Sequence, residues 1–117
     1  MLIKSIIRDV NEWLDRNVGV DYLNQPLAQD WARVAKVTEE AGEAVSELIL
    51  WTGQNPRKPL DLEARDRLMN ELADVVMTGV LAIQHFTNDV DVTETILIDR
   101  QLRTRDRMFR HLRETGQ

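Results

Sequence analysis

The sequence predicts an all-α protomer with a four-helix, bundle-like architecture. Apolar residues recur at helical spacing in four segments, and no segment shows sustained strand-like alternation. The three prolines and five glycines lie mostly between these segments, where they end helices or form loops. Because 117 residues suffice for one hydrophobic core, we interpret residues 1–117 as a single domain.

The first two expected helices cover the N-terminal half of the chain. The first runs from about residue 2 to 17, and Asn17, Gly19 and Asp21 then interrupt the helical pattern. The second runs from about residue 26 to 51. Pro26 suits its first turn, because the N–H that proline lacks is not needed there.

The last two expected helices follow a loop that contains two prolines. Asp61 is the expected N-cap of the third helix, which runs to about residue 86. The segment from Asp91 to Glu94 indicates a capping box for the fourth helix. That helix, which is rich in arginine, is expected over about residues 92–112.

The composition and charge exclude several function classes. The chain has no cysteine, which rules out disulfides and thiolate metal sites. Six arginines against three acids give residues 99–117 a charge of +3, so the total of −5 leaves −8 for the rest. An acidic body argues against binding to duplex nucleic acid. No segment resembles a signal peptide or a membrane span, so we expect a soluble, cytoplasmic protein with no membrane partner.

Two pairs of carboxylates share the same spacing on neighbouring helices. Glu40 and Glu43 lie three residues apart on the second helix, and Glu71 and Asp74 lie three apart on the third. Residues at this spacing share a helix face. In an antiparallel hairpin centred on position 57, Glu43 is level with Glu71, and Glu40 is level with Asp74. We therefore expect four carboxylates to converge at the edge of the helix seam.

Four converging carboxylates repel one another unless a cation compensates their charge. A ligand set made only of oxygen suits a hard ion such as Mg²⁺, with Mn²⁺ as a substitute. His85 and His111 are far apart in the sequence, which argues against zinc, and neither has an evident role. The alternative is a pair of ordinary solvated acidic faces, since Glu is a good helix former.

The segment Glu39-Glu40-Ala-Gly-Glu43, followed by Glu71-Leu-Ala-Asp74, resembles the EExxE…ExxD signature of MazG-like nucleoside triphosphate pyrophosphohydrolases. The resemblance covers about residues 24–86. It implies an all-α homodimer or homotetramer that cleaves a nucleoside triphosphate to the monophosphate and pyrophosphate. It also implies Mg²⁺ ligation by the motif acids, namely Glu40, Glu43, Glu71 and Asp74. Glu39 would be an accessory acid that orients a ligand or water.

Two features of the chain depart from the family pattern. Asn70 stands where many members have a second acid, and the family's C-terminal phosphate-binding pattern of Lys, Asn and Arg is not clear. The metal contacts are therefore better defined than the substrate contacts.

Catalysis needs charge neutralisation, an aligned water and a proton acceptor. Glu39 or Glu43 could orient the water or accept its proton. Trp31 or Trp51 could stack on a base, although aromatics at this spacing are also typical of a core. The cations that could neutralise phosphate, or simply lie on the surface, are Lys36, Arg57, Lys58, Arg100 and Arg103.

Two other readings remain open from the sequence. One is a related enzyme specialised for dUTP, dCTP or phosphoribosyl-ATP. The other is a non-catalytic helical interaction or regulatory module that kept the fold. The sequence has neither a P-loop nor a Rossmann glycine motif, so a nucleotide site of those types is not expected.

Overall fold

The computed structural model describes residues 2–16 and 26–117, and the predicted interruption at Asn17, Gly19 and Asp21 lies outside them. The all-α prediction is confirmed for the described residues, which contain no strand. Their helices are α1 (Lys4–Arg16), α3 (Pro26–Thr52), α4 (Ala64–Thr87) and α5 (Val90–Thr115). None of these helices is both long enough and apolar enough to traverse a lipid bilayer.

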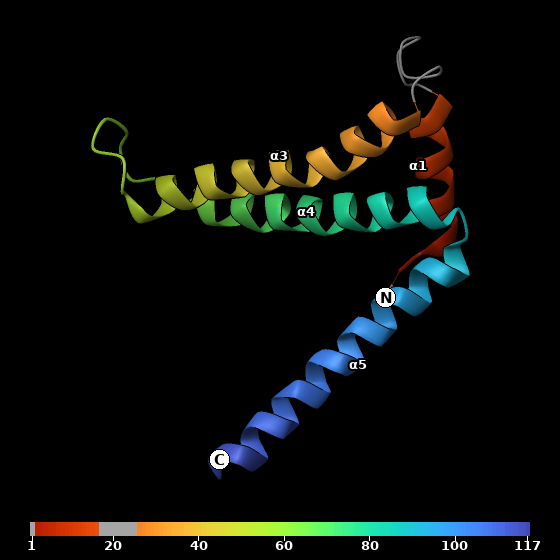
Figure 1. Ribbon diagram of the computed structural model, residues 1–117. Coiled ribbons are helices and arrows are strands. Elements are labelled where there is room, and N and C mark those ends of the chain that lie inside the picture. The colour runs from red at the N-terminus through yellow and green to blue at the C-terminus, as the bar shows by residue number, and fades with distance from the viewer. Residues whose placement is uncertain (1, 17–25) are drawn as a thin grey trace.

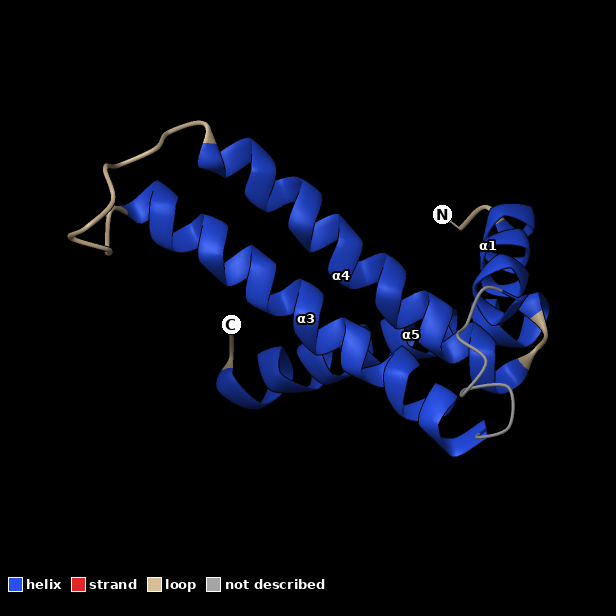
Figure 2. Ribbon diagram, turned by 90° about the horizontal axis from the view of Figure 1, so that it is seen from above, coloured by secondary structure: helices blue, strands red, loops and turns tan. Residues whose placement is uncertain are grey.

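The helices form an open bundle (Figure 1). The long helices α3 and α4 run antiparallel and side by side, as Figure 2 also shows from above. Helix α1 packs across the end at which α3 begins and α4 ends. Helix α5 starts at that same end and then diverges from the α3–α4 pair. The resulting molecule is thin, with extents of 47 × 46 × 24 Å.

The apolar core is small and lies mainly along α4. Small residues such as Ala44 and Ala64 are buried, and alanines let two helices approach closely. The buried apolar residues among those described are Ile7, Ala44, Ala64, Leu68, Val80, Leu81 and Ala82. Much of the apolar stripe predicted for α3 remains exposed, including Leu27, Trp31 and Val45.

A buried polar junction holds α1 against the α3–α4 pair. The Arg33 guanidinium donates hydrogen bonds to the Asn11 carbonyl oxygen at 3.2 Å and to Asp15 Oδ1 at 2.7 Å. On the same side, His85 Nε2 lies 2.6 Å from Asp30 Oδ1. His85, which had no evident partner in the sequence, therefore joins α4 to α3.

The predicted caps of the last two helices are wrong. Helix α4 begins with Glu63 as its N-cap, because the carboxylate of Asp61 accepts hydrogen bonds from the Glu63 N–H and from Arg67 instead. The N-cap of helix α5 lies two residues before Asp91, the first residue of the predicted capping box. The extended residue Asp89 caps it by accepting from the N–H groups of Asp91 and Val92.

The acids of the predicted capping box have another partner. Lys4 Nζ lies 2.9 Å from Asp91 Oδ1 and 3.3 Å from Glu94 Oε1. These ion pairs connect the start of α1 to the start of α5. Asn88, in the left-handed conformation at φ 51°, ends α4 and turns the chain into α5.

We predict that Thr93→Val loosens the corner between α4 and α5. The buried Thr93 hydroxyl donates to Gln84 Oε1 at 2.7 Å and lies 2.7 Å from Thr87 Oγ1. Valine has a similar shape but leaves the buried Gln84 oxygen without this donor, which costs about 1–3 kcal/mol. Urea unfolding measures the loss. Thr95→Val is the control, because the exposed Thr95 hydroxyl bonds only its own helix, and it is expected to change stability by less than about 0.5 kcal/mol.

Candidate metal centre

Three carboxylates converge at the seam between α3 and α4. Glu40 and Glu43 come from one face of α3, and Glu71 comes from α4. One carboxylate oxygen of each residue lies within 4.8 Å of the corresponding oxygens of the other two. Glu40 is buried, Glu71 is half-buried and Glu43 is exposed, so the group connects the seam to solvent. We call Glu40, Glu43 and Glu71 the carboxylate group.

The negative charges of the carboxylate group repel one another. The negative charge of Glu40 raises the pKa of Glu43, and side-chain hydrogen bonds with Glu40 and Glu71 raise it further. Glu71 Oε2 is buried and has no hydrogen-bond partner. A buried acceptor without a partner is unfavourable, and a cation held between the three carboxylates would satisfy it.

Lys36 lies at the edge of the carboxylate group. Its Nζ is 3.1 Å from Glu39 Oε1 and 3.2 Å from Glu40 Oε1. These hydrogen bonds, first to Glu39 and then to Glu40, raise the pKa of the Lys36 ammonium. Glu39 is exposed and is not a member of the carboxylate group. Lys36 therefore compensates part of the charge of Glu40 and holds Glu39 beside the site.

Asp74 is exposed and is not a member of the carboxylate group. It follows Glu71 by three residues, which turns it about 60° around α4 from Glu71. Glu43 lies near Glu71, as the hairpin register predicts. Glu40 was expected opposite Asp74, but it also lies near Glu71. The role of Asp74 as a fourth ligand stays a prediction.

Arg67 is a cation of this seam that the sequence analysis did not single out. Its Nε lies 3.0 Å from Glu47 Oε2, and its Nη2 lies 2.6 Å from Asp61 Oδ2. The bonds to Asp61 and then to Glu47 raise the pKa of Arg67, and the bond to Arg67 lowers the pKa of Asp61. The spacing in the sequence could have indicated this position, because Arg67 precedes Glu71 by four residues and so lies on the same face of α4.

The other predicted substrate contacts of the hairpin lie apart from the carboxylate group. Trp31 is exposed and lines a hollow of about 220 Å³ with Asp30, Val34 and Phe86. Nine residues separate it from Glu40, which places it about half a turn around α3. The half-buried Trp51 lies near the end of α3, and the exposed Arg57 and Lys58 lie in the loop beyond that end. Glu43 is about 13 Å from the same end.

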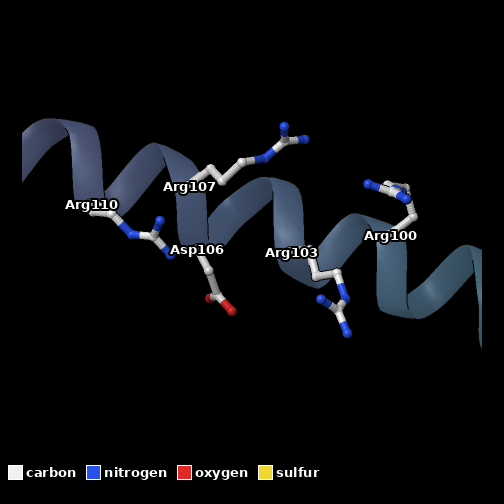
Figure 3. A pocket seen from close by; sticks show the side chains of 5 residues that line it. All are labelled: Arg100, Arg103, Asp106, Arg107 and Arg110. Atoms are coloured by element: carbon white, nitrogen blue, oxygen red, sulfur yellow. The ribbon is translucent and has the colours of Figure 1, made fainter.

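Arg100 and Arg103, the predicted substrate contacts on α5, lie with Arg107 and Arg110 in an exposed strip (Figure 3). Arg100 and Arg107 extend to one side of the helix in this view, and Arg103 and Arg110 extend to the other. Arg103 Nε lies 2.7 Å from Asp99 Oδ2. Among the described residues α5 does not pack on α3, so one protomer does not bring Arg100 or Arg103 to its own carboxylate group.

Comparison of the chain with protein-family models, curated proteins and solved structures gives no match. Function is therefore inferred from the residues of this chain and from their geometry. The strongest element of that geometry is the convergence of three carboxylates from two helices.

We predict that Glu43→Gln stabilises the protein in EDTA at neutral pH. A raised pKa in the folded state means that ionising Glu43 costs stability, and this cost develops as the pH rises from the ordinary value of 4.5 through the raised pKa. Glutamine carries no charge at any pH, so the variant avoids this cost. The difference in melting temperature should disappear below pH 4.5, where the wild-type carboxyl is protonated in both states.

The control for this prediction is Glu63→Gln. Glu63 is the N-cap of α4, makes no side-chain cap bond and lies outside the carboxylate group. Its substitution should bring no gain in stability at neutral pH. An equal gain in both variants would show that the effect comes from net charge and not from repulsion within the carboxylate group.

Proposed function

We propose that this chain is a Mg²⁺-dependent hydrolase that cleaves a nucleoside triphosphate to the monophosphate and pyrophosphate. The observation that carries the proposal is the carboxylate group, in which oxygens of Glu40, Glu43 and Glu71 gather within 4.8 Å of one another. The resemblance of these acids and Asp74 to the MazG-like signature supports the choice of reaction.

The residues present fit a hard divalent cation. All three members of the carboxylate group offer oxygen, and the buried Glu71 Oε2 has no other partner. Glu40, Glu43 and Glu71 would hold Mg²⁺ or Mn²⁺, and Asp74 would join them from the rim. When bound, the metal ion supplies positive charge to phosphate oxygens and lowers the pKa of water.

The neighbouring side chains supply the remaining parts of the reaction. Lys36 donates to Glu40. Neutralisation of Glu40 by a bound cation would release Lys36 to donate to a phosphate oxygen. The same release would free Glu39, which could then accept the proton of the attacking water. Arg67, one turn from Glu71, is a further cation within the seam.

Several finer features belong to this proposal. The substrate is a small nucleotide, which includes non-standard nucleotides and deoxynucleotides. The enzymatic alternative is a relative specialised for dUTP, dCTP or phosphoribosyl-ATP. We propose that the protein is cytoplasmic, works as a homodimer or homotetramer, and has neither duplex nucleic acid nor membrane as a partner. The alternative is a helical interaction module without catalysis, which differs from the proposed hydrolase in releasing no pyrophosphate from any nucleotide.

Metal binding should stabilise the fold. A ligand that binds only the folded state at about ten times its dissociation constant adds about 1.4 kcal/mol to the free energy of unfolding. For a domain of this size the melting temperature should rise by about 5 °C. The measurement is thermal unfolding in EDTA and in millimolar Mg²⁺ or Mn²⁺. The metal site is refuted if the curves coincide with every metal, with and without nucleotide.

Activity should depend on each member of the carboxylate group. A panel of nucleoside triphosphates is incubated with and without Mg²⁺, and pyrophosphate release is measured. Glu43→Gln and Glu71→Gln should each lower the rate at least about a hundredfold, because charge stabilisation dominates phosphoryl chemistry. Asp74→Asn should act alike if Asp74 is a ligand. Because the acids serve one step, double variants should be far from additive.

The matched control for activity is again Glu63→Gln. It removes one carboxylate from the start of α4, the helix that carries Glu71. It should change the rate by less than a few-fold. Wild-type protein that binds Mg²⁺ but releases no pyrophosphate from any nucleotide would favour the non-catalytic module. Activity that survives Glu43→Gln would exclude the carboxylate group as the reaction centre.

A further inference from the structure

A polar pocket lies at the corner where α1, the end of α4 and the start of α5 meet. Its volume is about 340 Å³. Helix α1 contributes Arg8, Asn11 and Glu12 to the lining. Gln84 of α4 and Asp89, the N-cap of α5, belong to the rest of it. We call this space the corner pocket.

The corner pocket is separate from the candidate metal centre. Gln84 follows Glu71 by thirteen residues on α4, which places it about 20 Å further along the helix. None of the acids of the carboxylate group lines the pocket. A small molecule held in the corner pocket would therefore be a second ligand, distinct from one held at the carboxylate group.

The Asn11 side chain is buried at this pocket without a partner for its oxygen. Asn11 is 2% exposed, and its Oδ1 has no hydrogen-bond partner among the described residues. The bond between Asn11 and Arg33 uses the backbone carbonyl of Asn11 and leaves the side chain unpaired. A buried acceptor without a partner is less stable than an apolar group of the same shape. A ligand that donates a hydrogen bond to Asn11 Oδ1 would supply the missing partner.

A second buried amide, Gln84, offers the complementary group. Gln84 is also 2% exposed, and its Oε1 accepts a hydrogen bond from the buried Thr93 hydroxyl at 2.7 Å. This bond fixes which end of the amide is the oxygen, so the Nε2 end is the donor that remains. The two buried amides thus present an acceptor from α1 and a donor from α4. They match a ligand in which an N–H and a C=O are neighbours.

The charged residues of the corner pocket favour a neutral ligand. Arg8, Glu12 and Asp89 are all exposed, so they form a rim that carries one positive and two negative charges. An anion would meet the two carboxylates, and a cation would meet the Arg8 guanidinium. The uncharged amides of Asn11 and Gln84 would not compensate an ion for its lost hydration. The volume lies at the lower end of the range for small-molecule sites, which is about 300–1,000 Å³.

We propose that the corner pocket binds a small neutral molecule with an amide edge, in which a neighbouring N–H and C=O point the same way. The N–H donates to Asn11 Oδ1, and the C=O accepts from Gln84 Nε2. Two biological sources carry this edge, namely an oxo-nucleobase such as uracil and a primary carboxamide such as nicotinamide. The site needs neither metal nor hydrolysis, so its test is independent of the proposed function.

The experiment follows the amide NMR spectrum of the full chain during titration with four small probes. Pyrrolidinone carries the amide edge, and N-methylpyrrolidinone has the same ring and carbonyl but no N–H. The amides around residues 8–12 and 84–90 should shift with pyrrolidinone, with a Kd in the millimolar range or below. N-Methylpyrrolidinone should bind at least about tenfold more weakly, because Asn11 then has no donor. Uracil and nicotinamide should shift the same amides, and the tighter of the two identifies the source.

Asn11→Leu separates binding from folding. Leucine has the same branched shape but no acceptor, and the backbone bond to Arg33 is kept. Pyrrolidinone should bind this variant at least about tenfold more weakly, whereas its melting temperature should be equal to that of the wild type or higher. Asn70→Leu is the matched control, because Asn70 is exposed and lies outside the pocket. It should bind pyrrolidinone as the wild type does.

Three results would overturn the proposal. The first is that no probe shifts the amides of the corner pocket, which would leave water as the only partner of Asn11 Oδ1. The second is equal binding of pyrrolidinone and its N-methyl derivative by the wild-type protein, a comparison that needs no variant. The third is an Asn11→Leu variant that binds as the wild type does but melts at a lower temperature, because Asn11 would then be purely structural.

Discussion

The carboxylate group and the apolar groove beside it both depend on the antiparallel contact between α3 and α4. Small buried residues, including Ala44 and Ala64, allow the two helices to lie close together. That approach brings Glu71 to Glu40 and Glu43 on one side of the seam and leaves on the other the apolar groove, which has a volume of about 360 Å³ and is lined by residues of both helices. Helix α1 fixes one end of the pair through the buried Arg33, and α5 leaves from the same end. A change in the spacing of this seam would alter both sides at once.

The carboxylate group illustrates a conflict between stability and function. Three acids that share one small volume raise the pKa of Glu43 and leave a buried oxygen of Glu71 without a partner. Lys36 offsets part of this charge at one edge of the site. The remaining negative charge destabilises the fold, and in the proposed function the same charge would attract a divalent cation. An apolar seam would be more stable but could not bind the metal ion that we propose for this site.

The sequence predicts local features of this protein better than contacts between distant residues. Helical periodicity located the described helices to within a few residues, and spacing by three indicated that Glu40 and Glu43 share a face. The caps at Glu63 and Asp89 were not predicted, because each helix start has several acids close together in the sequence and spacing alone does not choose among them. The bond between Asp30 and His85 joins residues 55 apart in the chain, and helical periodicity carries no information about such a pair. The divergence of α5 depends on the left-handed turn at Asn88, which the helical pattern does not reveal.

The central claim is that the convergence of α3 and α4 creates a cation site at Glu40, Glu43 and Glu71. Paramagnetic broadening by Mn²⁺ in the amide NMR spectrum locates such a site directly, because the effect is confined to nuclei near the bound ion. At a small fraction of one equivalent, the amides around residues 40–43 and 71–74 should broaden first, and those of α5 beyond residue 100 should remain sharp. Broadening that begins at other acids, or that is uniform along the chain, would contradict the account.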